Sequence, residues 1–158
     1  MSTMMKTITG TLCAGLLAAG LAAPAAAAPD VTIRGAKTAD LYMRADKPSK
    51  LEVKKSYAAF MNPSLPIGPK LEVSVNGAQN RGELQRMLAQ SRQYDFFSMK
   101  GDVVAVTVNG NTMTARFHGT MAGFPAQSFT YFYVREGKLW KYNWKQNAKT
   151  NGMPARFV

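Results

Sequence analysis

The chain is 158 residues long and basic, with 20 Lys and Arg against 9 Asp and Glu and a formal net charge of +11 at pH 7. Cys13 is the only cysteine, which excludes disulfides, thiolate metal sites and a cysteine nucleophile from the rest of the chain. The basic residues are scattered, with no run longer than Lys54-Lys55, so a solvated surface is expected and nucleic acid is not an expected partner. Attraction to an anionic cell envelope stays open.

The N-terminus has the pattern of a secretory signal peptide. A short n-region with one Lys precedes an apolar stretch over residues 7–21 and a run of small residues over 22–28. We expect cleavage after Ala27, which gives a periplasmic or secreted bacterial protein. Because Lys6 is the only charge lost, the net charge falls from +11 to +10. An uncleaved anchor is the alternative, although the apolar run is too short for stable insertion into a membrane.

The mature chain, of about 130 residues, suits one domain. We expect a leader over 28–48, the domain over 49–146 and a flexible C-terminal tail over 147–158, which is polar and interrupted by Gly and Pro.

Helical signals come first in the mature chain. Residues 38–46 are a candidate for a short helix. Ser49 and Glu52 form a capping box that starts a second helix, which reaches about residue 61. Its apolar side chains share one face: Val53, Tyr57, Phe60 and Met61. The three prolines of residues 62–69 predict a stiff, extended loop.

A strand and another helix follow the loop. Residues 71–75 alternate as a strand that Asn76-Gly77 closes. Asn80 is the predicted N-cap of a helix with Glu83 at its third position, and this helix ends near Ser91 or Arg92.

The remaining strands are expected to be mainly antiparallel. Residues 94–99 are one candidate, and residues 103–108 and 112–118 form a hairpin around Asn109-Gly110. A two-residue turn there pairs Val106 with Met113 and Val104 with Ala115.

A second hairpin, over residues 127–146 with its turn at Glu136-Gly137, holds most of the large aromatic residues. Because side chains alternate along a strand, six aromatic residues share one face. The expected pairs are Tyr133 with Trp140, Tyr131 with Tyr142, and Phe129 with Trp144. Tyr hydroxyls and Trp N–H groups need partners when they are buried. The face is therefore either a wet, ligand-holding cavity or ordinary core beneath the helices.

Four segments together resemble the nuclear transport factor 2-like superfamily: VKKSYAAF, NRGELQRML, VVAVTVNGNTMTARFHG and FYVREGKLWKYNW. The resemblance covers roughly residues 49–146. It implies an α+β fold, a cone-shaped roll in which a strongly curved, mainly antiparallel sheet wraps around two or three helices. The superfamily includes ketosteroid isomerases, polyketide-cyclase-like proteins and many non-catalytic binding or assembly domains.

The resemblance also implies where isomerase groups would lie. Those enzymes need an Asp base and an oxyanion hole made by a Tyr and a protonated Asp. Tyr57 falls at the tyrosine position, but the base position falls near Ser74 or Val75. The position of the second acid falls near Thr130, so two of the three groups are missing. The other interpretation of Tyr57 is a core residue on its helix.

Few other residues suggest chemistry. His118 is the only histidine, and one His cannot build a zinc site. The catalytic candidates are thus Tyr57 and His118. In the alternative interpretation His118 is an exposed strand residue. We expect no metal and no cofactor.

The sequence predicts an exported, non-catalytic domain that binds a small apolar or anionic ligand in an aromatic-lined cavity, or that serves as an assembly module. The expected ligand contacts are Tyr57, Arg116, Phe129, Tyr131, Tyr133, Trp140, Tyr142 and Trp144. The alternative is a cyclase- or isomerase-type enzyme acting on a hydrophobic substrate. A homodimer through the outer face of the sheet is a further expectation.

Overall fold

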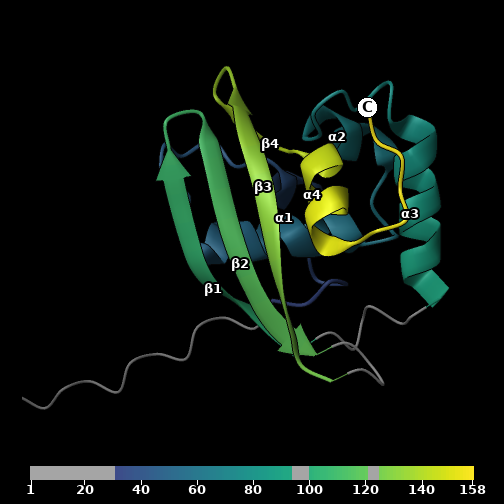
Figure 1. Ribbon diagram of the computed structural model, residues 1–158, viewed down its shortest axis with the longest axis horizontal. Coiled ribbons are helices and arrows are strands. Elements are labelled where there is room, and N and C mark those ends of the chain that lie inside the picture. Colours follow the sequence, from purple (N-terminus) through teal and green to yellow (C-terminus); the bar gives the residue numbers. More distant parts are fainter. Residues whose placement is uncertain (1–30, 94–99, 121–124) are drawn as a thin grey trace, which may run out of the picture.

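The computed structural model describes residues 31–93, 100–120 and 125–158 (Figure 1). A 3-10 turn, η1, precedes four helices and four strands in that part of the chain. In chain order the elements are η1 (Thr38–Leu41), α1 (Lys50–Met61), α2 (Ile67–Glu72), α3 (Arg81–Gln93), β1 (Lys100–Asn109), β2 (Thr112–Thr120), β3 (Gln127–Glu136), β4 (Leu139–Tyr142) and α4 (Trp144–Asn151). The predicted signal peptide and the predicted strand over 94–99 lie outside the described residues.

The four strands form one antiparallel sheet in the order β1-β2-β3-β4. Figure 1 shows α1 behind β1 to β3, and α2, α3 and α4 beyond the β4 side of the sheet. The predicted α+β class is confirmed. The sheet is neither closed nor strongly curled, so the cone-shaped roll stays a prediction. None of the helices in the described part of the chain has the length and apolar composition that a membrane span needs.

The capping box of α1 forms as predicted. Ser49 Oγ accepts the backbone N–H of Glu52 at 3.2 Å, and Glu52 Oε2 accepts that of Ser49 at 2.7 Å. Two donors that the first turn leaves unpaired are thereby satisfied. The predicted apolar stripe of α1 is buried against the sheet.

Two predictions between α1 and α3 are wrong. Residues 62–69 are not an extended loop throughout, and residues 71–75 are not a strand, because α2 occupies Ile67–Glu72. Pro66 takes the N-cap position, and Pro69 lies in the first turn, where its missing N–H costs no helical bond. What remains of the predicted strand is one parallel bridge between Ser74 and Tyr142. Local helical bonding therefore outcompetes the alternating pattern.

Two helix predictions also need correction. Residues 38–46 contain only the single turn η1, and α3 continues to Gln93. The side chain of Asn80 donates to the backbone oxygens of Val75, at 3.3 Å, and Val158, at 3.2 Å. Asn80 nevertheless holds the predicted N-cap position, since α3 begins at Arg81 and the backbone oxygen of Asn80 accepts the N–H of Leu84 at 2.9 Å.

Both hairpins turn one residue later than predicted. Asn109 pairs with Thr112, and Glu136 pairs with Leu139, so the turn residues are Gly110-Asn111 and Gly137-Lys138. Each strand pairing is shifted by two residues, which leaves side chains on their predicted faces wherever the pairing is regular. The predicted pairs themselves are wrong: Tyr133, for instance, lies opposite Tyr142.

A β-bulge changes one residue of the first hairpin. The register shifts between Val103 and Ala105, so Val104 is the extra residue. Val103 then points into the core, whereas Val104 is 39% exposed. The prediction that Val104 shares the inner face with Ala115 is therefore wrong.

Helix α4 covers a strand edge that β4 leaves open. The short β4 pairs with β3 only from Tyr133 onward. Asn147 binds both backbone groups of Phe132, accepting its N–H at 2.6 Å and donating to its oxygen at 3.3 Å. Asn151, one turn later, binds both groups of Thr130 at 3.3 and 2.9 Å. The two side chains imitate a neighbouring strand and satisfy the edge.

The start of α4 also corrects the predicted hairpin. Trp144 is the first residue of α4 and does not pair with Phe129. Residues 147–158, expected as a flexible tail, contain most of α4 and a buried Phe157.

Candidate functional site

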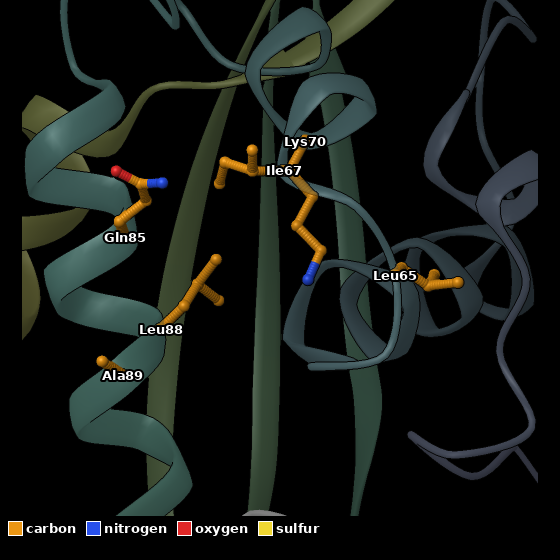
Figure 2. A pocket seen from close by; sticks show the side chains of 6 residues that line it. All are labelled: Leu65, Ile67, Lys70, Gln85, Leu88 and Ala89. Carbon is orange, nitrogen blue, oxygen red and sulfur yellow. The ribbon is translucent and has the colours of Figure 1, made fainter.

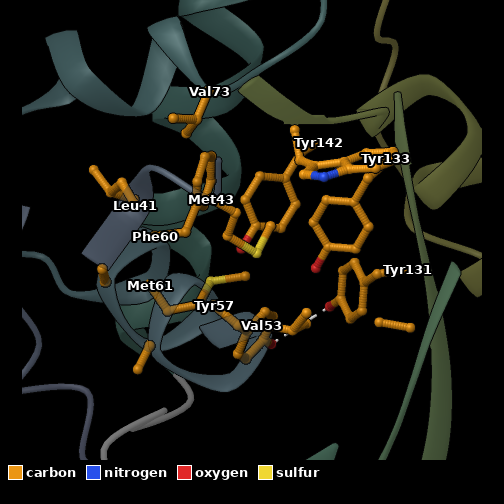
Figure 3. Packing of buried hydrophobic residues seen from close by; sticks show 14 of the residues in the cluster. Leu41, Met43, Val53, Tyr57, Phe60, Met61, Val73, Tyr131, Tyr133 and Tyr142 are labelled. Atoms are coloured by element: carbon orange, nitrogen blue, oxygen red, sulfur yellow. Dashed lines mark hydrogen bonds between the residues drawn. The ribbon is translucent and has the colours of Figure 1, made fainter. Parts of the chain in front are cut away.

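The structure brings most of the predicted aromatic residues together with Tyr57. Figure 3 shows Tyr131, Tyr133 and Tyr142 from β3 and β4 pointing toward the side chains of α1. The buried members of this aromatic cluster are Tyr57, Phe60, Phe117, Tyr131, Tyr133, Tyr142 and Trp144. Trp140 is buried nearer the turn of the second hairpin, where the Arg135 guanidinium lies 5.6 Å from its ring.

Two of the predicted ligand contacts, Phe129 and Arg116, are not buried in the aromatic cluster. Phe129 is only partly buried at its margin. Arg116 is exposed and alternates with buried Ala115 and Phe117, which places it on the outer face of the sheet. An anionic ligand among the aromatic residues would therefore not reach Arg116.

The rings of the aromatic cluster pack closely. Tyr142 and Trp144 are stacked, with centroids 5.0 Å apart and planes at 9°. Phe60 packs against both of them, at 4.8 and 4.7 Å. Tyr57 lies 5.2 Å from Tyr131. Such tilted and offset contacts are the preferred geometries of buried aromatic pairs.

Most polar tips in the aromatic cluster have protein partners. The hydroxyls of Tyr131 and Tyr57 lie 3.4 Å apart, and that of Tyr142 lies 3.1 Å from Ser56 Oγ. Trp144 Nε1 donates to Ser74 Oγ at 3.0 Å. The Tyr133 hydroxyl is buried and makes no hydrogen bond with the described residues. The cluster therefore has the character of a core with one unsatisfied polar group.

Burial raises the pKa of these tyrosines above the usual 10.0. Desolvation is the largest cause for Tyr57, Tyr131, Tyr133 and Tyr142, because it penalises the phenolate. The hydroxyl contact with Tyr57 raises the pKa of Tyr131 further. All four hydroxyls stay protonated at neutral pH, and that of Tyr131 donates to Tyr57.

These shifts predict an alkaline loss of stability. A tyrosine whose pKa is higher in the folded state stabilises the fold fully below its unfolded pKa of about 10, and loses that contribution as the pH rises further. Each such tyrosine contributes a slope of up to about 1.4 kcal/mol per pH unit above this point. Urea midpoints measured from neutral to strongly alkaline pH test this. A midpoint that stays constant above pH ~10 would contradict burial of the tyrosines.

The structure separates the two catalytic candidates. His118 is exposed on the outer face of the sheet, where its Nδ1 lies 2.9 Å from Ser128 Oγ. Tyr57 is buried beneath the inner face, and its hydroxyl contacts Tyr131. In the described residues no group of three or more His, Cys, Asp and Glu side chains is placed to hold a metal ion. The two candidates therefore cannot act on one substrate atom.

A pocket that sequence reasoning missed lies between α2 and α3. Its volume is about 240 Å³. Figure 2 shows the lining side chains, which come from α3 and from the segment that leads into and through α2. They are Leu65, Ile67, Lys70, Gln85, Leu88 and Ala89. Four of the six are apolar and Lys70 carries the only ionisable group among them.

Lys70 is the unusual residue of this pocket. It is only 1% exposed, and its Nζ donates to the backbone oxygen of Asn62 at 2.6 Å. Asn62 is the C-cap of α1, and its own side chain donates to Ala36 O at 3.1 Å. Lysine is almost never fully buried unless it is paired, because its ammonium group loses hydration. A buried ammonium beside apolar walls is suited to an anion.

Little in the residue pattern predicts this pocket. Lys70 fell between a predicted loop and a predicted strand, where one lysine is ordinary. Only the helical spacing of Ile67 and Lys70, three residues apart, would have placed both on one face of α2.

The chain matches a protein-family model. Residues 46–146 match the model described as low molecular weight antigen MTB12, C-terminal domain. No curated protein and no solved structure matches the chain. The predicted resemblance to the nuclear transport factor 2-like superfamily is therefore wrong. It rested on the order of helices and strands, and one of those elements, the strand at 71–75, is not formed.

Proposed function

The chain belongs to the family of the low molecular weight antigen MTB12, C-terminal domain, and from this premise we propose that it is an exported, non-catalytic domain that binds a small ligand. The family is one of secreted bacterial antigens, which supports the export predicted from the N-terminal sequence. Cleavage after Ala27 lies outside the described residues and stays a prediction.

The ligand site that we propose is the pocket between α2 and α3. The observation that carries this proposal is the burial of Lys70 in a pocket whose other walls are largely apolar. Small-molecule sites typically combine apolar walls with a few polar groups that fix orientation. A ligand with a short apolar body and one carboxylate, sulfate or phosphate would match Leu65, Ile67 and Leu88 with its body and Lys70 with its charge.

The aromatic cluster is less suited to hold a ligand than the pocket between α2 and α3. Its rings are in contact, and the hydroxyl of Tyr142 and the indole N–H of Trp144 are taken by Ser56 and Ser74. Binding there would have to break these contacts. A ligand in an aromatic-lined cavity, an enzyme of the cyclase or isomerase type, and a dimer through the outer sheet face stay predictions with no contact in their favour.

The pocket predicts selective binding of an anion. Octanoate should bind the mature protein with a Kd of about 0.1–1 mM, since a ligand of this size gains only modest free energy. Octan-1-ol, which has the same chain and no charge, should bind at least about tenfold more weakly. Isothermal titration calorimetry measures both affinities.

Lys70→Met should remove the preference for octanoate while keeping the apolar body of the side chain. The variant should fold, because replacing a buried charge with an apolar group of similar size is often neutral or stabilising. Lys149→Met, an exposed lysine on α4, is the matched control and should leave the affinity unchanged. Equal binding of the two probes, or undiminished octanoate binding by Lys70→Met, would sink the proposal.

A further inference from the structure

The segment that follows α4 lies against the core with a strand-like burial pattern. Residues 153, 155 and 157 point inward, whereas 154, 156 and 158 are exposed. Phe157 is only 7% exposed, and its ring lies 6.0 Å from that of Trp144. Met153 and Ala155 pack against the core beside it. Figure 1 shows this last segment running between α4 and α3 toward α2.

Side chains on and just before α3 bind the backbone of this segment at alternate residues. Asn80 accepts the N–H of Val158 at 2.9 Å and donates to its oxygen at 3.2 Å. Glu83 Oε1 accepts the N–H of Arg156 at 2.6 Å. Such contacts involve only the backbone of the bound segment and do not depend on its side chains. They would therefore hold any extended segment in the same place.

A third contact extends the row. Arg86 donates to the oxygen of Pro154 at 3.3 Å and also pairs with Glu83. The three side chains are spaced three residues apart, which puts them on one face of the helix. Together with the hollow that receives Phe157 they form what we call the clasp: Asn80, Glu83 and Arg86.

The clasp lies apart from the ligand pocket. The pocket takes Gln85, Leu88 and Ala89 from α3. At 100° per residue the mean direction of these positions is roughly 140° from that of Glu83 and Arg86, although Ala89 is only about 60° from Arg86. The clasp and the ligand pocket therefore share no residue.

The segment can leave the clasp without unfolding the elements around it. Gly152 precedes the segment with φ +63, and a Cβ there would meet nothing within 4 Å. Helix α4 is anchored separately, since Asn147 and Asn151 bind the edge of β3. A change of backbone angles at this one exposed glycine therefore redirects Met153–Val158 while α4 stays in place.

We propose that the clasp is a peptide-binding site which a second copy of this chain can fill with its own Met153–Val158. Exchange of this segment between two copies restores its contacts with Asn80, Glu83 and Arg86, while the bond from the Met153 N–H to Ala148 O is lost at the Gly152 hinge. The specificity follows from the burial pattern. The site takes an extended segment with apolar residues at alternate positions and a large aromatic residue near its end.

A peptide in trans tests the clasp. Arg156→Pro removes the N–H that Glu83 accepts and leaves Phe157 in the chain. This variant should release its own segment and bind the synthetic peptide GMPARFV with a Kd of about 0.1–1 mM. The wild-type chain should bind the peptide about two- to tenfold more weakly, because its own segment competes at a millimolar effective concentration. Arg156→Ala keeps the N–H and should behave as wild type.

The peptide GMPARAV, which lacks the aromatic residue, is the matched control and should not bind. Failure of GMPARFV to bind Arg156→Pro, with the fold intact by circular dichroism, would overturn the clasp as a peptide site. Binding of both peptides with equal affinity would overturn the assigned specificity.

A mixture of two variants tests the second copy as the occupant. Arg156→Pro has an intact clasp that its own segment leaves empty. Asn80→Ala has an intact segment, but its clasp lacks the two hydrogen bonds to Val158. Light scattering of undiluted samples, at about 1 mM protein, should show monomers for each variant alone and a heterodimer for the mixture. A mixture that stays monomeric would overturn the second copy as the partner.

Discussion

Gly77→Ala is expected to destabilise the domain by about 3 kcal/mol or more. A Cβ at Gly77 would lie 1.9 Å from the backbone oxygen of Leu71 and 2.7 Å from its carbonyl carbon. Backbone cannot yield as the end of a flexible side chain does. Leu71 O also accepts the N–H of Ser74 at 3.1 Å, and Ser74 O accepts that of Gly77 at 3.1 Å. The substitution would have to break this local network.

Urea denaturation followed by circular dichroism measures the change. Gly82→Ala is the matched control, because a Cβ there meets nothing within 4 Å in the first turn of α3. It should be neutral or raise the free energy of unfolding by about 0.5–1 kcal/mol. If the two variants lose stability equally, the close approach of Gly77 to α2 does not exist. Since Gly77 packs on the end of α2, its substitution should also weaken octanoate binding at Lys70.

The elements that sequence reasoning found correctly are those that depend on neighbouring residues. Ser49 and Glu52 are three residues apart, so the capping box needs nothing from the rest of the chain. The aromatic face survived a two-residue error of register because side-chain direction has period two. The bulge at Val104 inserts one extra residue and so changes which side chains of β1 face the core. No residue type in the sequence predicts this bulge.

The elements that were missed depend on distant partners. Asn147 and Asn151 look like ordinary polar residues of a tail until the open edge of β3 is beside them. Asn80 does hold the predicted N-cap position of α3, but its side-chain contact with Val158 depends on a distant segment. The alternating residues 71–75 predict a strand, but the structure has a helix that begins after Pro66 and ends at Glu72. Helical hydrogen bonds between neighbouring residues form there in place of strand pairing.

In the candidate site, too, the features set by neighbouring residues were predictable and those set by distant residues were not. Period two was enough to predict that Tyr131, Tyr133 and Tyr142 share a face. Whether that face is a wet cavity or a core depends on partners for its polar tips. Those partners, Ser56 and Ser74, come from segments whose placement no sequence pattern fixed. Burial of a lysine is equally invisible, because it follows from how α2 and α3 pack.

Trp144→Ala is expected to lower the free energy of unfolding by about 3–5 kcal/mol. The indole stacks on Tyr142 at 5.0 Å and packs against Phe60 at 4.7 Å. Its N–H donates to Ser74 Oγ at 3.0 Å, and Ser74 in turn donates to Lys70 O at 2.7 Å. The side chain therefore joins the sheet to the α2 segment, and its loss leaves a cavity that neighbours on several elements would have to fill.

Two further variants separate the ring from its N–H group. Trp144→Phe keeps an aromatic ring and loses the donor, and Ser74→Ala loses the acceptor. In a double-mutant cycle between them the coupling energy should be about 1 kcal/mol. Most of the loss in Trp144→Ala should therefore come from packing, and Trp144→Phe should recover a large part of it.

The size of this loss decides between the two interpretations of the aromatic face. A tryptophan that lines an open, hydrated cavity has few contacts to lose, so its truncation should cost about 1 kcal/mol or less. A tryptophan packed on Tyr142, Phe60 and Phe157 should cost several times that. Urea midpoints of Trp144→Ala and wild type give the answer directly. A small loss would return the ligand to the aromatic cluster, and a large loss leaves the Lys70 pocket as its place.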